Sequence, residues 1–133
     1  MSRSDVLSKL KNHGVLPTPQ RLEVAELLLN RPQHLSADQI IDRLRDAGSR
    51  VSKATVYNTL KLFSEKALVK ECNVDPSRKF YDSAMHSHHH FFHVDTGELS
   101  DIPADQVSIN TLPNLPRGTE LENVEILIRV RNR

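Results

Sequence analysis

The chain has 133 residues, of which 38% are hydrophobic and 26% charged, and its formal net charge at pH 7 is +1. This length suits one ordinary domain or two small ones that share a core, and the composition is that of a soluble globular protein. No apolar run approaches the roughly 18 residues of a membrane span, and residues 1–5 lead into no apolar signal region, so we expect a cytoplasmic protein without a membrane partner. The single cysteine, Cys72, excludes an intrachain disulfide and any zinc site made of several cysteines from one chain.

Charge is unevenly divided along the chain. Residues 1–84 carry 14 Lys and Arg against 10 Asp and Glu, a net charge of +4, whereas residues 85–133 carry 4 against 7, a net charge of −3. A basic first part suggests a polyanionic partner, and an acidic second part suggests cations or another subunit. The two parts are therefore expected to have different partners.

The first part predicts four helices with clear boundaries. The first helix spans 4–12 and ends before Gly14, and the second follows the cap and first-turn proline Thr18-Pro19 and stops before Pro32. Apolar residues recur at helical spacing in all four: Val6, Leu7 and Leu10; Leu22, Ala25, Leu28 and Leu29; Ile40, Ile41 and Leu44; Val56, Leu60 and Phe63.

The third and fourth helices are joined by a short connection. The third opens at the capping-box pattern of residues 36–39 and is closed by Gly48, and the fourth starts at Ser52. The spacing fits a helix-turn-helix, whose second helix enters the DNA major groove with its N-terminal residues at the bases. The fourth helix is therefore the predicted recognition helix.

Polar side chains of the fourth helix are suited to DNA. Lys53 and Lys61 can reach phosphates, and Tyr57 and Asn58 can offer hydrogen bonds or methyl contacts to base edges. The candidate DNA contacts are Arg21, Ser52, Lys53, Thr55, Tyr57, Asn58, Lys61 and Arg78.

A β-hairpin is predicted after the fourth helix. Residues 68–74 and 79–81 flank the turn signal Asp75-Pro76-Ser77-Arg78, so basic residues lie near the tip. Such a hairpin is a wing that can lie along the DNA backbone. The alternative from pattern alone is an ordinary helical domain with a solvated basic face.

The second part changes its apolar period from 3.6 to 2. Residues 91–94 and 98–102, with a turn at 95–97, predict a short hairpin, and alternating apolar residues over 124–130 predict a terminal strand. Prolines in between permit only a short helix around 104–110. A sheet of three strands is marginal alone, so we expect a homodimer, whose two-fold symmetry suits palindromic DNA.

Five of the seven histidines fall within residues 86–93. Imidazole is the commonest neutral metal ligand and can ligate haem iron, and buried imidazoles need hydrogen-bond partners, so core packing alone is a poor account of the cluster. In an extended segment His88 and His90 point to one face and His89 and His93 to the other. Haem would find axial ligands among these four, beside the aromatic residues 91–92. The alternative is a solvated polar strand end.

Several motifs together resemble a known family. The run Ser52-Lys53-Ala54-Thr55-Val56-Tyr57, with His88-His89-His90 about 30 residues later and then Asp95-Thr96-Gly97, resembles the ferric uptake regulator (Fur) family over most of the chain. The tripled histidine before residues 91–92 is most similar to the iron response regulator (Irr) branch, whose members sense haem.

The resemblance implies an α+β fold with two domains. A winged helix-turn-helix domain for DNA binding would occupy residues 1–84, and a small α/β domain for dimerisation and metal or haem sensing would occupy residues 85–133. The regulatory metal site would lie at their junction, where a shared cation would lock the inter-domain angle. Its ligands, carried over from the family, would be His34, Asp82, His88 and His90, and the imidazole–carboxylate mixture suits zinc, manganese or ferrous iron.

The chain also departs from the family pattern. The usual pair of Cys-x-x-Cys motifs is missing, with His93 and Thr96 at the first pair's positions, so we expect no structural zinc held by four cysteines. Asn58 stands where many relatives carry arginine, so the operator sequence is expected to differ.

Together these features predict a repressor that controls iron or metal homeostasis, binds palindromic operators as a homodimer and responds to a divalent metal or haem. We expect no enzymatic activity and no small-molecule substrate. One alternative is a metal- or haem-storage module without DNA function. The other is a zinc-dependent hydrolase, for which the sequence lacks an HExxH helix.

Overall fold

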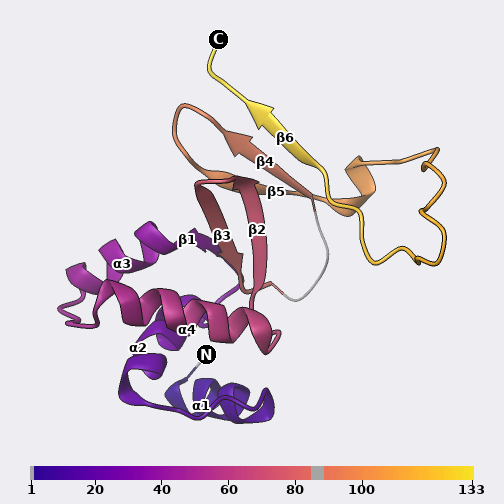
Figure 1. The fold of residues 1–133 in the computed structure, drawn as a ribbon. Coiled ribbons are helices and arrows are strands. Elements are labelled where there is room, and N and C mark those ends of the chain that lie inside the picture. Colours follow the sequence, from indigo (N-terminus) through magenta and orange to yellow (C-terminus); the bar gives the residue numbers. More distant parts are fainter. Residues whose placement is uncertain (1, 85–88) are drawn as a thin grey trace. The chain divides into compact units, whose positions relative to one another are not determined.

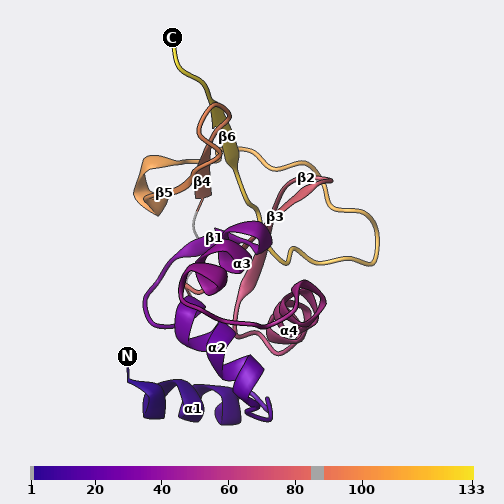
Figure 2. The same ribbon diagram turned by 90° about the vertical axis from the view of Figure 1, so that its left-hand side faces the viewer.

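The computed structural model describes residues 2–84 and 89–133 (Figures 1 and 2). The chain divides into two compact units, Met1–Met85 and His86–Arg133, and each is described by itself. The first unit combines four helices with a three-stranded sheet, and the second contains another three-stranded sheet, which gives the predicted α+β fold. Over the described ranges, none of the helices has the length and apolar character needed to span a membrane.

The helices of the first unit begin and end at local signals in the sequence. They are α1 (Arg3–Asn12), α2 (Pro19–Leu28), α3 (Ala37–Asp46) and α4 (Lys53–Glu65). The predicted caps Thr18, Ser36 and Ser52 each accept a hydrogen bond from the backbone N–H three residues later. Gly14 and Gly48, which follow α1 and α3, have φ angles of +73° and +83°, where a side chain would be strained. The four predicted helices are therefore confirmed.

The first unit has a continuous apolar core. The fully buried Phe63 of α4 is among its largest side chains, and Tyr81 contributes from the sheet. Helix residues supply most of the rest, including Val6, Leu10, Val24, Leu28, Ile40, Leu44, Val56 and Leu60. Because these residues recur every three or four positions, one face of each helix is buried and the other faces solvent.

A small antiparallel sheet completes the first unit. Its strands are β1 (His34–Ser36), β2 (Lys70–Asp75) and β3 (Arg78–Asp82), in the order β1-β3-β2. The β2–β3 hairpin is the predicted wing, and it projects away from the helices of this unit in both views (Figures 1 and 2). Strand β1 was not predicted, because three residues are too short to display a period of two.

The second unit contains the predicted hairpin and terminal strand. Strands β4 (His89–His93) and β5 (Leu99–Ile102) are antiparallel, and β6 (Leu127–Val130) pairs with β4 in parallel, giving the order β5-β4-β6. His90 and Phe92 are buried, whereas their neighbours in β4 are half-buried. The predicted alternation of the histidines is thus confirmed for the described part of the cluster.

The predicted helix around residues 104–110 is wrong in extent. A single 3-10 turn, η1 (Ala104–Gln106), ends where Val107 takes up an extended conformation. Valine, serine and isoleucine at 107–109 are modest helix formers, and Pro113 limits any continuation. The segment after η1 has no helix or strand before β6 and exposes several apolar side chains, namely Ile109, Leu112, Leu115 and Leu121.

Candidate metal ligands and DNA-binding surface

Two predicted metal ligands are neighbours in the first unit. His34 of β1 is paired in register with Asp82 of β3, so their side chains leave the same face of the sheet. Asp82 is 3% exposed, and one of its carboxylate oxygens accepts a hydrogen bond of 2.8 Å from the N–H of Ala84. The unpredicted strand β1 therefore brings an imidazole beside a positioned carboxylate, at the end of the wing opposite its tip.

The second unit contributes a third predicted ligand. His90 is 7% exposed in β4 and lies in register with Asp101 of β5. Its Nε2 is 3.4 Å from a carboxylate oxygen of Asp101. Sequence reasoning missed Asp101, although counting register back from the turn at 95–97 would have placed it opposite His90. The fourth predicted ligand, His88, lies outside the described residues.

His89 is already engaged through one ring nitrogen. Its Nδ1 accepts a hydrogen bond of 3.0 Å from the N–H of Ile126, just before β6 begins. A neutral imidazole whose Nδ1 is an acceptor carries its proton on Nε2. The Nε2 of His89 therefore lacks the free lone pair that a metal or haem iron requires.

His93 has both ring nitrogens engaged. Its Nδ1 accepts the N–H of Thr96 at 3.2 Å, so its Nε2–H donates to Oδ1 of Asn132 at 2.9 Å. The N–H of Asn132 in turn donates to Asp95 at 2.7 Å. These hydrogen bonds join the β4–β5 turn to the C-terminal end of the chain. His93 and Phe91 also border a hollow of about 320 Å³ on this sheet.

The predicted recognition helix presents a polar surface. Ser52 uses its hydroxyl to accept the N–H of Thr55 and to donate to the Thr55 hydroxyl at 2.8 Å. Tyr57 is 43% exposed although it is a large aromatic residue. The other exposed candidates on this helix are Lys53, Asn58 and Lys61. These six candidate DNA contacts therefore lie together on α4 and at its N-cap.

The two remaining DNA candidates come from other elements. Arg78 is exposed at the start of β3, near the wing tip. Arg21, near the start of α2, donates to the carbonyl of Leu16 at 2.8 Å. Tyr81 lies in the wing, where burial and, secondarily, the Glu71 carboxylate raise the pKa of its phenol above the usual value. The phenol therefore stays neutral at physiological pH.

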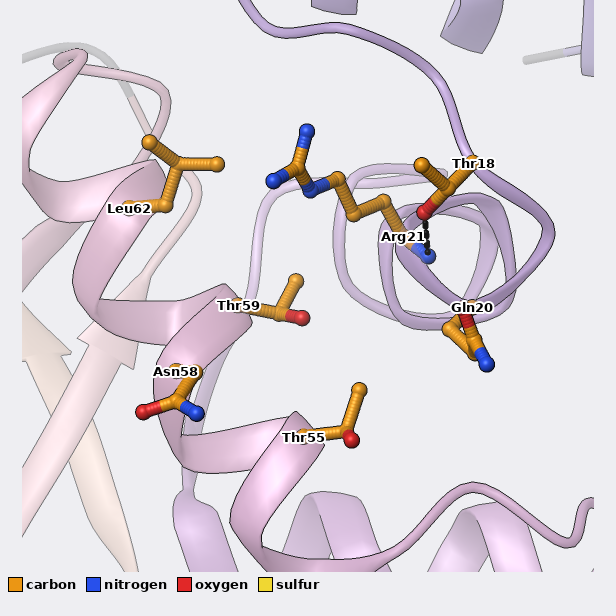
Figure 3. Close-up of a pocket in the computed structure, with 7 residues that line it drawn as sticks. All are labelled: Thr18, Gln20, Arg21, Thr55, Asn58, Thr59 and Leu62. Carbon is orange, nitrogen blue, oxygen red and sulfur yellow. Dashed lines mark hydrogen bonds between the residues drawn. The ribbon is translucent and has the colours of Figure 1, made fainter.

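A polar hollow lies between α2 and α4 (Figure 3). Its volume is about 340 Å³, and it is open to solvent. It is lined by Thr18, Gln20 and Arg21 from the start of α2 and by Thr55, Asn58, Thr59 and Leu62 from α4. Sequence patterns did not indicate this hollow, because it depends on how two helices pack.

Similar proteins are known. The peroxide-responsive repressor PerR of Staphylococcus saprophyticus is 32% identical over 103 residues, which cover 77% of this chain and 70% of that protein. The peroxide operon regulator of Bacillus subtilis is 36% identical over 97 residues, covering 73% of this chain and 67% of that protein. These relatives are regulators and not enzymes.

Solved structures and a family model agree with this relationship. The ferric uptake regulator of Pseudomonas aeruginosa, solved with manganese, is 27% identical, covers 100% of this chain and 99% of its own, and has a TM-score of 0.71. The Vibrio cholerae ferric uptake regulator, 24% identical with 95% of this chain and 98% of its own covered, supports the fold with a TM-score of 0.74. The model of the ferric uptake regulator family matches residues 12–129. The chain therefore belongs to the ferric uptake regulator family of metal-responsive, DNA-binding transcriptional regulators.

Proposed function

We propose that this regulator represses transcription by binding a palindromic operator as a homodimer, under the control of a divalent cation. The observation that carries the proposal is the pairing of His34 with Asp82 at the foot of the wing. A cation bound there contacts the same sheet that carries Arg78 near the wing tip. Metal binding and DNA binding thus share one structural element.

The proposed ligands are His34, Asp82, His88 and His90, with Asp101 as an additional carboxylate. Three imidazoles and two carboxylates form a donor set that suits zinc, manganese or ferrous iron. The proximity of His90 to Asp101 supports both as members of this set, because a carboxylate can either bind the metal or orient the imidazole. The manganese of the Pseudomonas aeruginosa regulator supports a divalent cation rather than a particular metal.

DNA recognition is assigned to α4 and the wing. Tyr57 and Asn58 read base edges, and the hydroxyls of Ser52 and Thr55 contact DNA near the helix N-terminus. Basic side chains at Arg21, Lys53, Lys61 and Arg78 contact phosphates. Occupancy of the metal site changes the spacing of the two recognition helices in the dimer, and only one spacing matches successive major-groove faces.

Within the family, the tripled histidine and residues 91–92 favour the Irr branch and a response to haem. The hydrogen bonds of His89 and His93 restrict where haem iron can bind, because ligation by either would break a contact to the backbone. Axial ligation is therefore assigned to His88 or His90. Loss of the haem absorption band on replacing these two, but not His89 or His93, is the expected result.

A second candidate response is to peroxide. It is favoured by the two peroxide regulators that are similar to this chain at 32% and 36% identity. Peroxide should then inactivate the protein when it is loaded with ferrous iron but not when it is loaded with zinc, because only iron transfers electrons to peroxide.

One titration series tests the proposed function. Chelated protein is mixed with a duplex that it selects from a random pool, and Fe(II), Mn(II), Zn(II) and haem are added separately while DNA affinity is measured. At least one ligand should change the affinity, and His34→Ala and His90→Ala should abolish the response to a cation. His13→Ala is the matched control, since the His13 ring at the end of α1 hydrogen-bonds the carbonyl of Lys9 and is not among the proposed ligands.

The opposite results would assign another role. Failure to select any duplex, with or without ligand, would leave a metal- or haem-storage module as the better description. A cation response that survives both replacements would remove the proposed ligands, and an unchanged response to haem would remove the Irr assignment.

A further inference from the structure

The hollow between α2 and α4 is lined by a largely buried threonine, Thr59, whose hydroxyl has no partner within the described residues. Thr59 is only 4% exposed and lines the hollow, and Figure 3 shows its side chain directed from α4 toward α2. Within residues 2–84 and 89–133, its hydroxyl makes no hydrogen bond. Unlike the hydroxyl oxygen of Ser64, that of Thr59 is not a fully buried atom, so it is open to the hollow, where a ligand oxygen can replace water as its partner.

The start of α2 presents a backbone donor to the same hollow. Pro19 has no N–H, the N–H of Arg21 donates to the Thr18 hydroxyl, and the N–H of Leu22 donates to the Thr18 carbonyl. In this first turn, all of which the structure describes, the N–H of Gln20 is therefore the one left for a ligand. The helix dipole favours a negative charge at this end.

The charges around the hollow indicate an anion. Its lining contains one cation, Arg21, and no carboxylate. Hydroxyl groups come from Thr18, Thr55 and Thr59, and amides come from Gln20 and Asn58. Figure 3 shows the Arg21 side chain extending from α2 toward α4. A cationic fork, hydroxyl groups and a helix N-terminus together suit a tetrahedral oxyanion.

We propose that this hollow binds a phosphodiester group of the DNA backbone, held by Arg21, the N–H of Gln20 and the hydroxyl of Thr59. The inference rests on the proposed DNA-binding function and adds Gln20 and Thr59 to it. This phosphate-binding site lies on one side of α4, next to the residues assigned to base edges. A phosphate fixed there sets the register of α4 in the major groove and carries no sequence information itself.

Three variants test the phosphate-binding site in the full-length protein. Thr59→Val removes the hydroxyl at nearly constant shape and should weaken binding about 5- to 10-fold, equally on the selected duplex and on a shuffled duplex of the same composition. Thr59→Ser should restore binding. Arg21→Gln should lower the slope of log affinity against log salt by about 0.9 per protomer.

Matched controls separate the hollow from general effects. Ser64→Ala removes a hydroxyl of α4 that is buried, has no partner within the described residues and does not line the hollow, and it should leave DNA affinity unchanged. Arg131→Gln removes an exposed charge from the second unit and should leave the salt slope unchanged. The midpoint of thermal unfolding of Thr59→Val should match that of the wild type, because the hydroxyl that it removes has no hydrogen-bond partner within residues 2–84 and 89–133.

A DNA-free measurement distinguishes this inference from the proposed function. Inorganic phosphate should shift the amide resonances of Gln20 and Thr59 in the unliganded wild type, and Arg21→Gln should abolish the shift. The proposed phosphate site would be overturned if inorganic phosphate caused no such shift, or if Thr59→Val had the same DNA affinity as Ser64→Ala. Wild-type protein that selects no duplex, yet shows the phosphate shift, would instead count against the operator-binding function.

Discussion

The two units are stabilised by different kinds of contact. In residues 2–84 one apolar cluster connects all four helices and the sheet, with Phe63 at 0% exposure. In residues 89–133 few apolar side chains are buried, chiefly Phe92, Leu99 and Ile102. The second unit instead attaches its C-terminal strand through backbone pairing of β6 with β4 and through hydrogen bonds to the His89 and His93 side chains.

This difference indicates that the first unit is stable by its own core, whereas the stability of the second unit depends on partners. The apolar core of the first unit can hold the recognition helix and wing in one geometry without help from outside. A three-stranded sheet is marginal alone, and exposed apolar residues such as Leu112 and Leu115 lie between its strands β5 and β6 in the sequence. We therefore expect the second unit to gain stability from a bound ligand or from a second copy of the chain.

The largest expected effect is on the core of the first unit. Phe63→Ala should lower the free energy of unfolding by about 3–5 kcal/mol, because the cavity that it leaves can relax only partly. Chemical denaturation followed by circular dichroism measures the change. Leu16→Ala is the control, since Leu16 is 72% exposed and its replacement should change stability by less than about 0.5 kcal/mol. Equal losses of unfolding free energy in the two variants would contradict the assignment of the first unit's stability to its apolar core.

The next effect concerns the proposed metal ligands of the second unit. Asp101→Asn should weaken divalent cation binding about 10- to 100-fold, whether the carboxylate binds the metal or only orients His90. Isothermal titration with Mn(II) or Zn(II) measures this, and the exposed Asp105→Asn is the control. If both variants bind cations as the wild type does, Asp101 is not part of the site.

A smaller effect is expected at the attachment of the C-terminal strand. His93→Ala removes the bonds to Thr96 and Asn132 and should cost about 1 kcal/mol, since both bonds are exposed to solvent. Hydrogen exchange should quicken over residues 127–132 and stay unchanged in α1–α4. Val94→Ala, whose backbone bond to Val130 is retained, should exchange as the wild type does. Faster exchange in both units would show that they unfold together.

The smallest effect is at the start of α1. Hydrogen bonds from the backbone N–H and hydroxyl of Ser2 lower the pKa of Asp5 below its usual value of 3.8. A lowered pKa means that the folded state favours the carboxylate, so its contribution is present above pH 3.8 and is lost as the pH falls through the folded-state value.

Backbone amide shifts of residues 2–6, followed from pH 6 to pH 2, should report fraying of the first turn of α1 in the wild type. Asp5→Asn lacks the titrating group and should show no such transition. A transition of the same size in that variant would assign the change to another group.

Local features of the sequence determined the helices, the wing and the β4–β5 hairpin. Caps such as Ser36 act on backbone groups within four residues, and turn residues such as Gly97 act on their immediate neighbours, so both can be recognised from a short window. The recognition-helix candidates were identified for the same reason. The alternation of His90 with its neighbours followed from the period of a strand.

The tertiary structure alone decided which distant segments meet. Pairing of β1 with β3 places His34 beside Asp82, pairing of β4 with β5 places Asp101 beside His90, and the packing of α2 on α4 forms the hollow around Thr59. Such contacts depend on register and on burial summed over many residues, which no short window contains. The sequence by itself thus determined the elements and the kinds of ligand they carry, and the folded chain determined which of them act together.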